Sequence, residues 1–223
     1  MSSSAPHAPA LGERFDAALA FAVETHRHDA RKVSNVPYVA HLLGVCSLVL
    51  ENGGDEVEAC AALLHDAAED HGGRPMLAEI ERRFGSAVAA IVENCSDSFE
   101  EAGATKAPWL DRKQAYIAHL ASLARKADGE PTLLVSAADK LYNLRSIRDD
   151  ALRLDAGGEP AGDRVYARFR AGKWGSLWYY RALADVYASV DGRHRLLGIE
   201  LGALVDGLSG RKDAAELLAR YRA

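Results

Sequence analysis

Residues 59–70 read ACAALLHDAAED, an apolar run that ends in two pairs of polar residues. At helical spacing His65 pairs with Glu69 and Asp66 pairs with Asp70, and the two pairs lie about 100° apart around the helix axis. Unpaired buried charges cost several kcal/mol each, so this side of a helix needs a cation or a hydrogen-bonded network. The stretch predicts either a divalent-metal site with spare carboxylates for proton transfer, or a helix end that faces water.

Two other apolar segments also carry polar residues. His41 is bracketed by VA and LL, and Asp139 lies in LLVSAADKL with Asn143 one turn further along the same face. One such residue is usually a core residue whose hydrogen bonds are satisfied. Three helices that carry polar residues in the order His, His-Asp, Asp instead suggest a shared site. Two imidazoles and two carboxylates complete most of a shell around Mn²⁺, Fe²⁺ or Zn²⁺. We expect His41, His65, Asp66 and Asp139 to lie within about 2.0–2.4 Å of one ion.

The apolar spacing is helical from residue 11 onward, and no strand alternation is found, so the predicted fold class is all-α with the metal site between central helices. Residues 96–108 predict a long loop, and residues 155–162 a turn-rich break. We expect a flexible tail over 1–10, one domain over 11–195, and a C-terminal helical extension packed on it over 196–223. The expected helices lie near residues 15–23, 41–49, 56–71, 77–84, 86–94, 109–126, 131–144, 164–170, 177–190, 196–208 and 213–221.

The composition is that of a globular protein, with 48% hydrophobic and 26% charged residues in a chain of 223. A net charge of −5 gives no general affinity for nucleic acid or an anionic membrane, so an anionic substrate needs a local cluster of Arg and Lys. Cys46, Cys60 and Cys95 lie in apolar patterns and predict buried thiols in a reducing compartment. No signal peptide or membrane span is expected, which predicts a cytoplasmic protein. The oligomeric state is left open.

Several segments together carry a family resemblance: RK at 31–32, PYVAH at 37–41, AALLHDAAED at 61–70, IVENCSD at 91–97, RK at 112–113 and ADKLYNLR at 138–145. Their order resembles the HD superfamily of metal-dependent phosphohydrolases. The chain is most similar to the hydrolase domain of RelA/SpoT homologues, in the form of their small stand-alone alarmone hydrolases, over about residues 11–190. The resemblance implies an HD-domain helical bundle that hydrolyses (p)ppGpp at its 3′-pyrophosphate with Mn²⁺, giving pyrophosphate and GDP or GTP.

The resemblance also implies a role for each matching residue. The metal ligands would be His41, His65, Asp66 and Asp139. The groups that hold and deprotonate the attacking water, or protonate the leaving oxygen, would be Glu69 and Asp70. The substrate-binding residues would be Arg31 and Lys32 over the nucleobase or phosphates, Asn143 to orient the substrate, and Arg112 and Lys113 on the distal phosphates. The last two could equally be solvated helix charges.

The chain departs from the family pattern in two places. The loop before Pro37 is one residue longer than usual, and Leu42 stands where the family commonly has proline. The aromatic and basic segment 173–180 could either cap the pocket or pack in the core. Other substrates stay open, namely (p)ppApp, NADPH or a nucleoside monophosphate, as does a non-catalytic nucleotide sensor. Cations from several segments favour a polyphosphorylated nucleotide.

Overall fold

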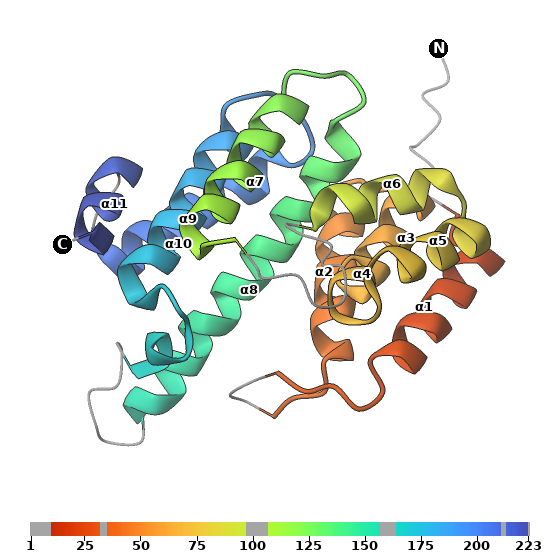
Figure 1. The fold of residues 1–223 in the computed structure, drawn as a ribbon, viewed down its shortest axis with the longest axis horizontal. Helices are drawn as coiled ribbons and strands as arrows, with labels where there is room; N and C mark the ends of the chain where they lie inside the picture. Colours follow the sequence, from red (N-terminus) through yellow and green to blue (C-terminus); the bar gives the residue numbers. More distant parts are fainter. Residues whose placement is uncertain (1–9, 32–34, 97–106, 157–163, 211–212, 223) are drawn as a thin grey trace, which may run out of the picture.

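The computed structural model describes residues 10–31, 35–96, 107–156, 164–210 and 213–222, and this part of the chain is helical (Figure 1). It contains no strand, only an isolated bridge between Ala30 and Pro37, so the predicted all-α class is confirmed. The first six helices are α1 (Glu13–Thr25), α2 (Val39–Glu51), α3 (Glu56–Leu64), α4 (Ala67–Asp70), α5 (Gly73–Phe84) and α6 (Ser86–Cys95). The others are α7 (Trp109–Leu123), α8 (Glu130–Ala156), the 3₁₀ helix η1 (Arg164–Arg168), α9 (Gly172–Ala188), α10 (Arg195–Ser209) and α11 (Ala214–Arg222).

The long helix α8 runs through the middle of the molecule (Figure 1). Helices α1 to α6 lie on one side of it, and α7 and α9 to α11 lie on the other. Because both sides are covered, no residue from 133 to 138 is more than 2% exposed. This explains why the first half of α8 is apolar almost all round. Helices α2, α3 and α8 pack against one another, so the three helices that carry the polar intrusions meet at the centre.

The stretch 56–71 is not one helix as the sequence suggested. Helix α3 ends at Leu64, and α4 begins at Ala67 after a two-residue turn. The His65 ring bonds through Nδ1 to the carbonyl of Ala62 at 2.8 Å, and this carbonyl is the one that a continuous helix would offer to the amide of Asp66. The His65 side chain thus competes with the Asp66 amide for the carbonyl of Ala62. The break frees the side chains of His65 and Asp66 from the fixed 100° offset between consecutive residues of a regular helix.

Other boundaries differ less. Helix α8 extends twelve residues beyond Leu144 (to Ala156), and the segment expected as a helix over 164–170 is the 3₁₀ helix η1. Helix α9 begins at Gly172, so most of the aromatic segment 173–180 packs into the core, with Trp178 and Tyr179 buried. Most of the predicted long loop, 97–106, lies outside the described residues. The domain boundaries proposed above stay predictions. Among the described helices none is long and apolar enough to cross a membrane.

Candidate metal centre and its pocket

The close contact between α2 and α8 positions the first histidine. His41 lies in the first turn of α2 and is fully buried. One turn later, Gly44 faces Tyr142 of α8, and a Cβ built on Gly44 would lie 1.9 Å from the ring. The Tyr142 hydroxyl donates to the carbonyl of Ala40 at 3.2 Å. The absent side chain at Gly44 therefore lets α2 approach α8 closely enough for His41 to face Asp139.

The four predicted ligands converge, although they come from three segments. His41 Nε2 lies 3.3 Å from His65 Nε2, 3.4 Å from Asp66 Oδ2 and 3.3 Å from Asp139 Oδ1. His65 Nε2 lies 3.0 Å from Asp66 Oδ2 and 3.5 Å from Asp139 Oδ1. The donor atoms of His41, His65 and Asp139 all lie within 4.8 Å of one another, and these three residues are buried.

This donor set fits a divalent metal ion. Nitrogen and oxygen ligands about 2.0–2.2 Å from one ion lie about 3.0–3.5 Å from each other, which matches the separations observed. Burial alone would lower the pKa of His65, but Asp66 and Asp139 outweigh it and raise the pKa well above its usual value. The site therefore favours an added positive charge among its donors, and a divalent cation supplies one.

Three further side chains hold the carboxylates in place. The Tyr38 hydroxyl donates to Asp66 Oδ2 at 2.6 Å, and Asn143 Nδ2 donates to Asp139 Oδ1 at 2.5 Å. Lys140, which is itself largely buried, forms an ion pair with Asp139 Oδ2. Such partners orient ligands and tune their basicity. Tyr38 and Lys140 lie within the quoted motifs, but sequence reasoning did not assign either of them a role.

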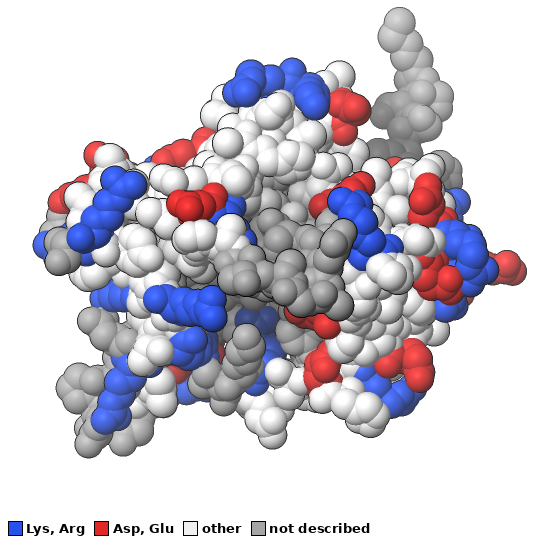
Figure 2. Space-filling model, viewed as in Figure 1, with Lys and Arg blue, Asp and Glu red and all other residues white. Residues whose placement is uncertain are grey.

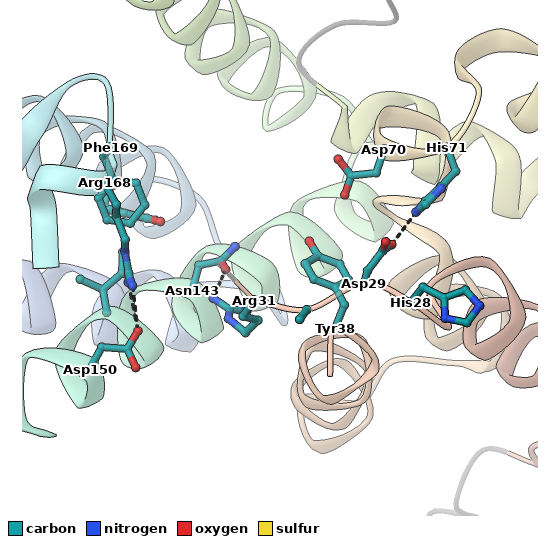
Figure 3. Close-up of a pocket in the computed structure, with 13 residues that line it drawn as sticks. His28, Asp29, Arg31, Tyr38, Asp70, His71, Asn143, Asp150, Arg168 and Phe169 are labelled. Atoms are coloured by element: carbon teal, nitrogen blue, oxygen red, sulfur yellow. Dashed lines mark hydrogen bonds and ion pairs between the residues drawn. The ribbon is translucent and has the colours of Figure 1, made fainter. Parts of the chain in front are cut away.

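The centre adjoins a pocket of about 540 Å³ (Figure 3). One wall carries His28, Asp29, Asp70 and His71, and Tyr38, Arg31 and Asn143 lie between this wall and the opposite one. The opposite wall carries Ile147, Asp150, Arg168, Phe169 and Tyr180. Arg168 donates to Asp150 Oδ2 through both terminal nitrogens, at 3.0 and 3.1 Å, and its guanidinium lies over the Phe169 ring. No motif in the sequence indicated this far wall.

The two candidate proton-transfer groups follow the ligands on α4. Asp70 lines the pocket, and its pKa is raised, first because the surrounding protein desolvates it and then because Asp66 is negatively charged. A raised carboxyl pKa makes it easier for this group to take up a proton. Glu69 is exposed. The pocket lining does not include Glu69.

The predicted cations are only partly gathered at the pocket. Arg31 lines it and donates to Asn143 Oδ1 at 3.0 Å, while Lys32 lies outside the described residues. Arg112 donates to the Ala107 carbonyl at 3.3 Å, and Lys113 Nζ lies 4.7 Å from the centre of the Tyr179 ring. Neither of these two residues belongs to the described lining of the pocket.

The fold and this site define an all-helical protein with a buried His-His-Asp metal centre. The chain belongs to the HD domain family, whose family model matches residues 18–177. It is 38% identical over 131 residues to guanosine-3′,5′-bis(diphosphate) 3′-pyrophosphohydrolase MESH1 of Xenopus tropicalis, a match that covers 57% of this chain and 66% of that protein. The human MESH1 protein is 35% identical over 130 residues, covering 57% of this chain and 65% of that protein. The chain thus spans just under two-thirds of these relatives.

A solved structure supports the same fold. It is described as a metazoan ortholog of SpoT that hydrolyzes ppGpp and plays a role in starvation responses. The TM-score is 0.62 at 22% identity, and the match covers 90% of this chain and 97% of that one.

Proposed function

We propose that this protein is a metal-dependent phosphohydrolase that removes the 3′-pyrophosphate of (p)ppGpp, giving pyrophosphate and GDP or GTP, with Mn²⁺ as the preferred ion. The observation that carries the proposal is the convergence of His41, His65, Asp66 and Asp139 beside a pocket that also holds Asp70 and Arg31. The names of the relatives support the substrate, because two of them are guanosine-3′,5′-bis(diphosphate) 3′-pyrophosphohydrolases.

The four convergent residues would hold the ion, which when bound lowers the pKa of a coordinated water and polarises a phosphoryl oxygen. Asp70 takes the proton of the attacking water on its carboxylate, with Glu69 as the second carboxylate on α4. The water oxygen bonds to the phosphorus next to the ribose 3′ oxygen, the P–O3′ bond breaks, and the leaving oxygen takes up a proton. Arg31 binds substrate phosphate or base, and Asn143 links Arg31 to Asp139.

The direct test is an activity panel. The purified 223-residue chain with Mn²⁺ is incubated separately with ppGpp, ppApp, NADPH and nucleoside monophosphates, and the products are separated by chromatography. We expect GDP and pyrophosphate in equal amounts from ppGpp, and no turnover after chelation of the metal. Survival of ppGpp while another nucleotide is consumed contradicts the guanine substrate. Survival of every nucleotide with metal bound points to a sensor.

The role of Arg31 has its own test. The variant Arg31→Met should raise KM for ppGpp more than it lowers kcat, because the guanidinium contributes mainly to binding. Arg27→Met is the matched control, since Arg27 lies four residues earlier and pairs with the exposed Glu24 rather than lining the pocket. An unchanged KM in Arg31→Met would remove Arg31 from the substrate site.

A further inference from the structure

A second group of metal-ligating side chains lies beside the pocket. His26 caps the C-terminus of α1, Asp29 follows in the next loop, and His71 caps the C-terminus of α4. Their donor atoms all lie within 4.8 Å of one another. Figure 3 shows His71 and Asp29 joined on the pocket wall, with Asp70 close by. None of the three residues belongs to the donor set around His41.

The two imidazole nitrogens point at the same carboxylate oxygen. His26 Nδ1 lies 2.9 Å and His71 Nε2 lies 2.5 Å from the same oxygen, Asp29 Oδ2. The two rings meet edge to face, with centroids 4.7 Å apart and an interplanar angle of 83°. The nitrogens therefore approach the carboxylate from different ring planes. Two imidazole nitrogens and one carboxylate oxygen are a ligand set that Zn²⁺ prefers, with water in the remaining position.

Packing holds the buried member of the group in the required orientation. His26 is 2% exposed, and its ring stacks on Tyr38 with centroids 5.1 Å apart. Its Nε2 has no hydrogen-bond partner within the described part of the chain. The ring therefore bonds through Nδ1, which faces Asp29. A donor whose direction is already fixed loses little freedom when it binds an ion.

The other two members give an ion access to the site. The side chains of Asp29 and His71 are 35% and 32% exposed, and both line the 540 Å³ pocket. An ion can enter through this opening, and water can fill the positions that the protein leaves open. Because Asp70 lines the same wall, an ion held here would add positive charge near that carboxylate.

We propose that His26, Asp29 and His71 form a second divalent-metal site, suited to Zn²⁺, which is separate from the His41 centre and opens into the same pocket. An ion bound there takes the place of the two hydrogen bonds that now meet on Asp29. The proposal concerns binding and does not depend on which nucleotide the protein hydrolyses.

The test counts metal ions per chain. The 223-residue chain is stripped of metal, loaded with Zn²⁺, desalted and measured by elemental mass spectrometry. We expect two ions per chain in the wild type and one in each of Asp29→Asn and His71→Gln. Asp139→Asn, which removes a ligand of the other centre, should also leave one ion. The same proteins are also loaded with Co²⁺ and their visible spectra are recorded. The absorption band that each variant lacks is then assigned to the centre that the substitution removes.

The control is His28→Gln, because His28 lines the same pocket but does not belong to the group. It should keep both ions. Asparagine and glutamine preserve hydrogen-bonding side chains, and circular dichroism verifies the fold; if His71→Gln does not fold, Asp29→Asn decides alone. A single ion in the wild type, or two ions in a folded Asp29→Asn variant, overturns the proposal.

Discussion

Asp66 and Asp70 lie one helical turn apart, yet their surroundings push their pKa values in opposite directions. Burial alone would raise the pKa of Asp66, but His65 and His41 outweigh it and hold the value well below the usual range. The pKa of Asp70 is raised by desolvation and by the negative charge of Asp66. Two carboxylates with opposite shifts are suited to different tasks. Asp66 is suited to binding a cation, and Asp70 is suited to carrying a proton.

Replacing the two carboxylates proposed for proton transfer should therefore separate chemistry from metal binding. We expect Asp70→Asn, and to a similar extent Glu69→Gln, to lower kcat by roughly 10²–10⁴ while the protein keeps its metal. Steady-state kinetics and metal analysis on the same preparations check this. Wild-type turnover in both variants would remove the assigned role, and a loss of metal would show that the residues act as ligands.

At the scale of secondary-structure elements, the metal centre depends on the contact between α2 and α8. A methyl group at Gly44 would overlap the Tyr142 ring, whose hydroxyl bonds to α2. We expect Gly44→Ala to lower the free energy of unfolding by about 1–3 kcal/mol through overpacking, and to weaken metal binding by moving His41 away from Asp139. Chemical denaturation and a metal titration measure both effects.

The matched control for this substitution is Gly207→Ala in α10. A Cβ at Gly207 would meet nothing within 4 Å, so alanine should raise the free energy of unfolding by up to about 1 kcal/mol through helix propensity. The two substitutions should change the free energy of unfolding in opposite directions, and the two changes need not be equal in size. The interpretation fails if Gly44→Ala is as stable as the wild type and binds metal normally.

Arg193 ties three elements of the fold together. Its guanidinium donates to both carboxylate oxygens of Glu58 at 2.7 and 2.8 Å, to the Gly53 carbonyl at 2.9 Å and to Glu130 at 3.1 Å. Glu58 is 2% exposed and also closes the capping box of α3 with Asp55. The loop before α10 is thereby joined to the N-termini of α3 and α8.

Breaking this connection should be costly because it leaves Glu58 buried without its cation. We expect Arg193→Met to lower the free energy of unfolding by about 2–4 kcal/mol, the lower part of that range reflecting the partial exposure of the arginine. Arg195→Met is the control, since its pair with Asp191 is exposed and should contribute less than about 1 kcal/mol. Similar losses in the two variants would contradict this account.

On the scale of the whole molecule, charge is distributed unevenly around the pocket. The chain has a net charge of −5, but on the face shown in Figure 2 Lys and Arg side chains gather over the lower left, where the end of α8, η1 and the start of α9 lie. The Arg168 wall of the pocket belongs to this side. A local positive field of this kind draws in an anionic substrate that the net charge would repel.

Stability should also depend on pH through a buried histidine. His194 is 2% exposed, and neither ring nitrogen has a hydrogen-bond partner in the described residues. Burial is the main reason why its pKa is lowered from 6.5. As pH falls below about 6.5, the unfolded chain takes up a proton that the folded protein does not, so stability present at higher pH is lost by at most about 1.4 kcal/mol per pH unit.

His194→Leu removes the titrating imidazole and breaks no side-chain hydrogen bond among the described residues. We expect the variant to lose less stability than the wild type between pH 7 and pH 5, and the difference in stability between the two proteins to stay constant above pH 7. Urea denaturation at a series of pH values measures the difference. Parallel curves for the two proteins would show that His194 is not the titrating group.

The sequence by itself determined the all-α class, the order of most helices and which residues to propose as metal ligands. These features depend on local information, because helical periodicity shows which positions are buried and a polar residue at such a position needs a partner. The donor atoms of His41, His65 and Asp139 do meet as the pattern predicted.

The tertiary structure alone decided the rest. The break between α3 and α4, the far wall with Arg168 and Phe169, and the meeting of His26, Asp29 and His71 have no signal in spacing. The break follows from the bond between the His65 ring and the Ala62 carbonyl. The far wall and the three-residue group depend on how closely distant helices approach, which side-chain volumes set, as at Gly44. Those volumes act only once the chain has folded, so spacing along the sequence does not reveal them.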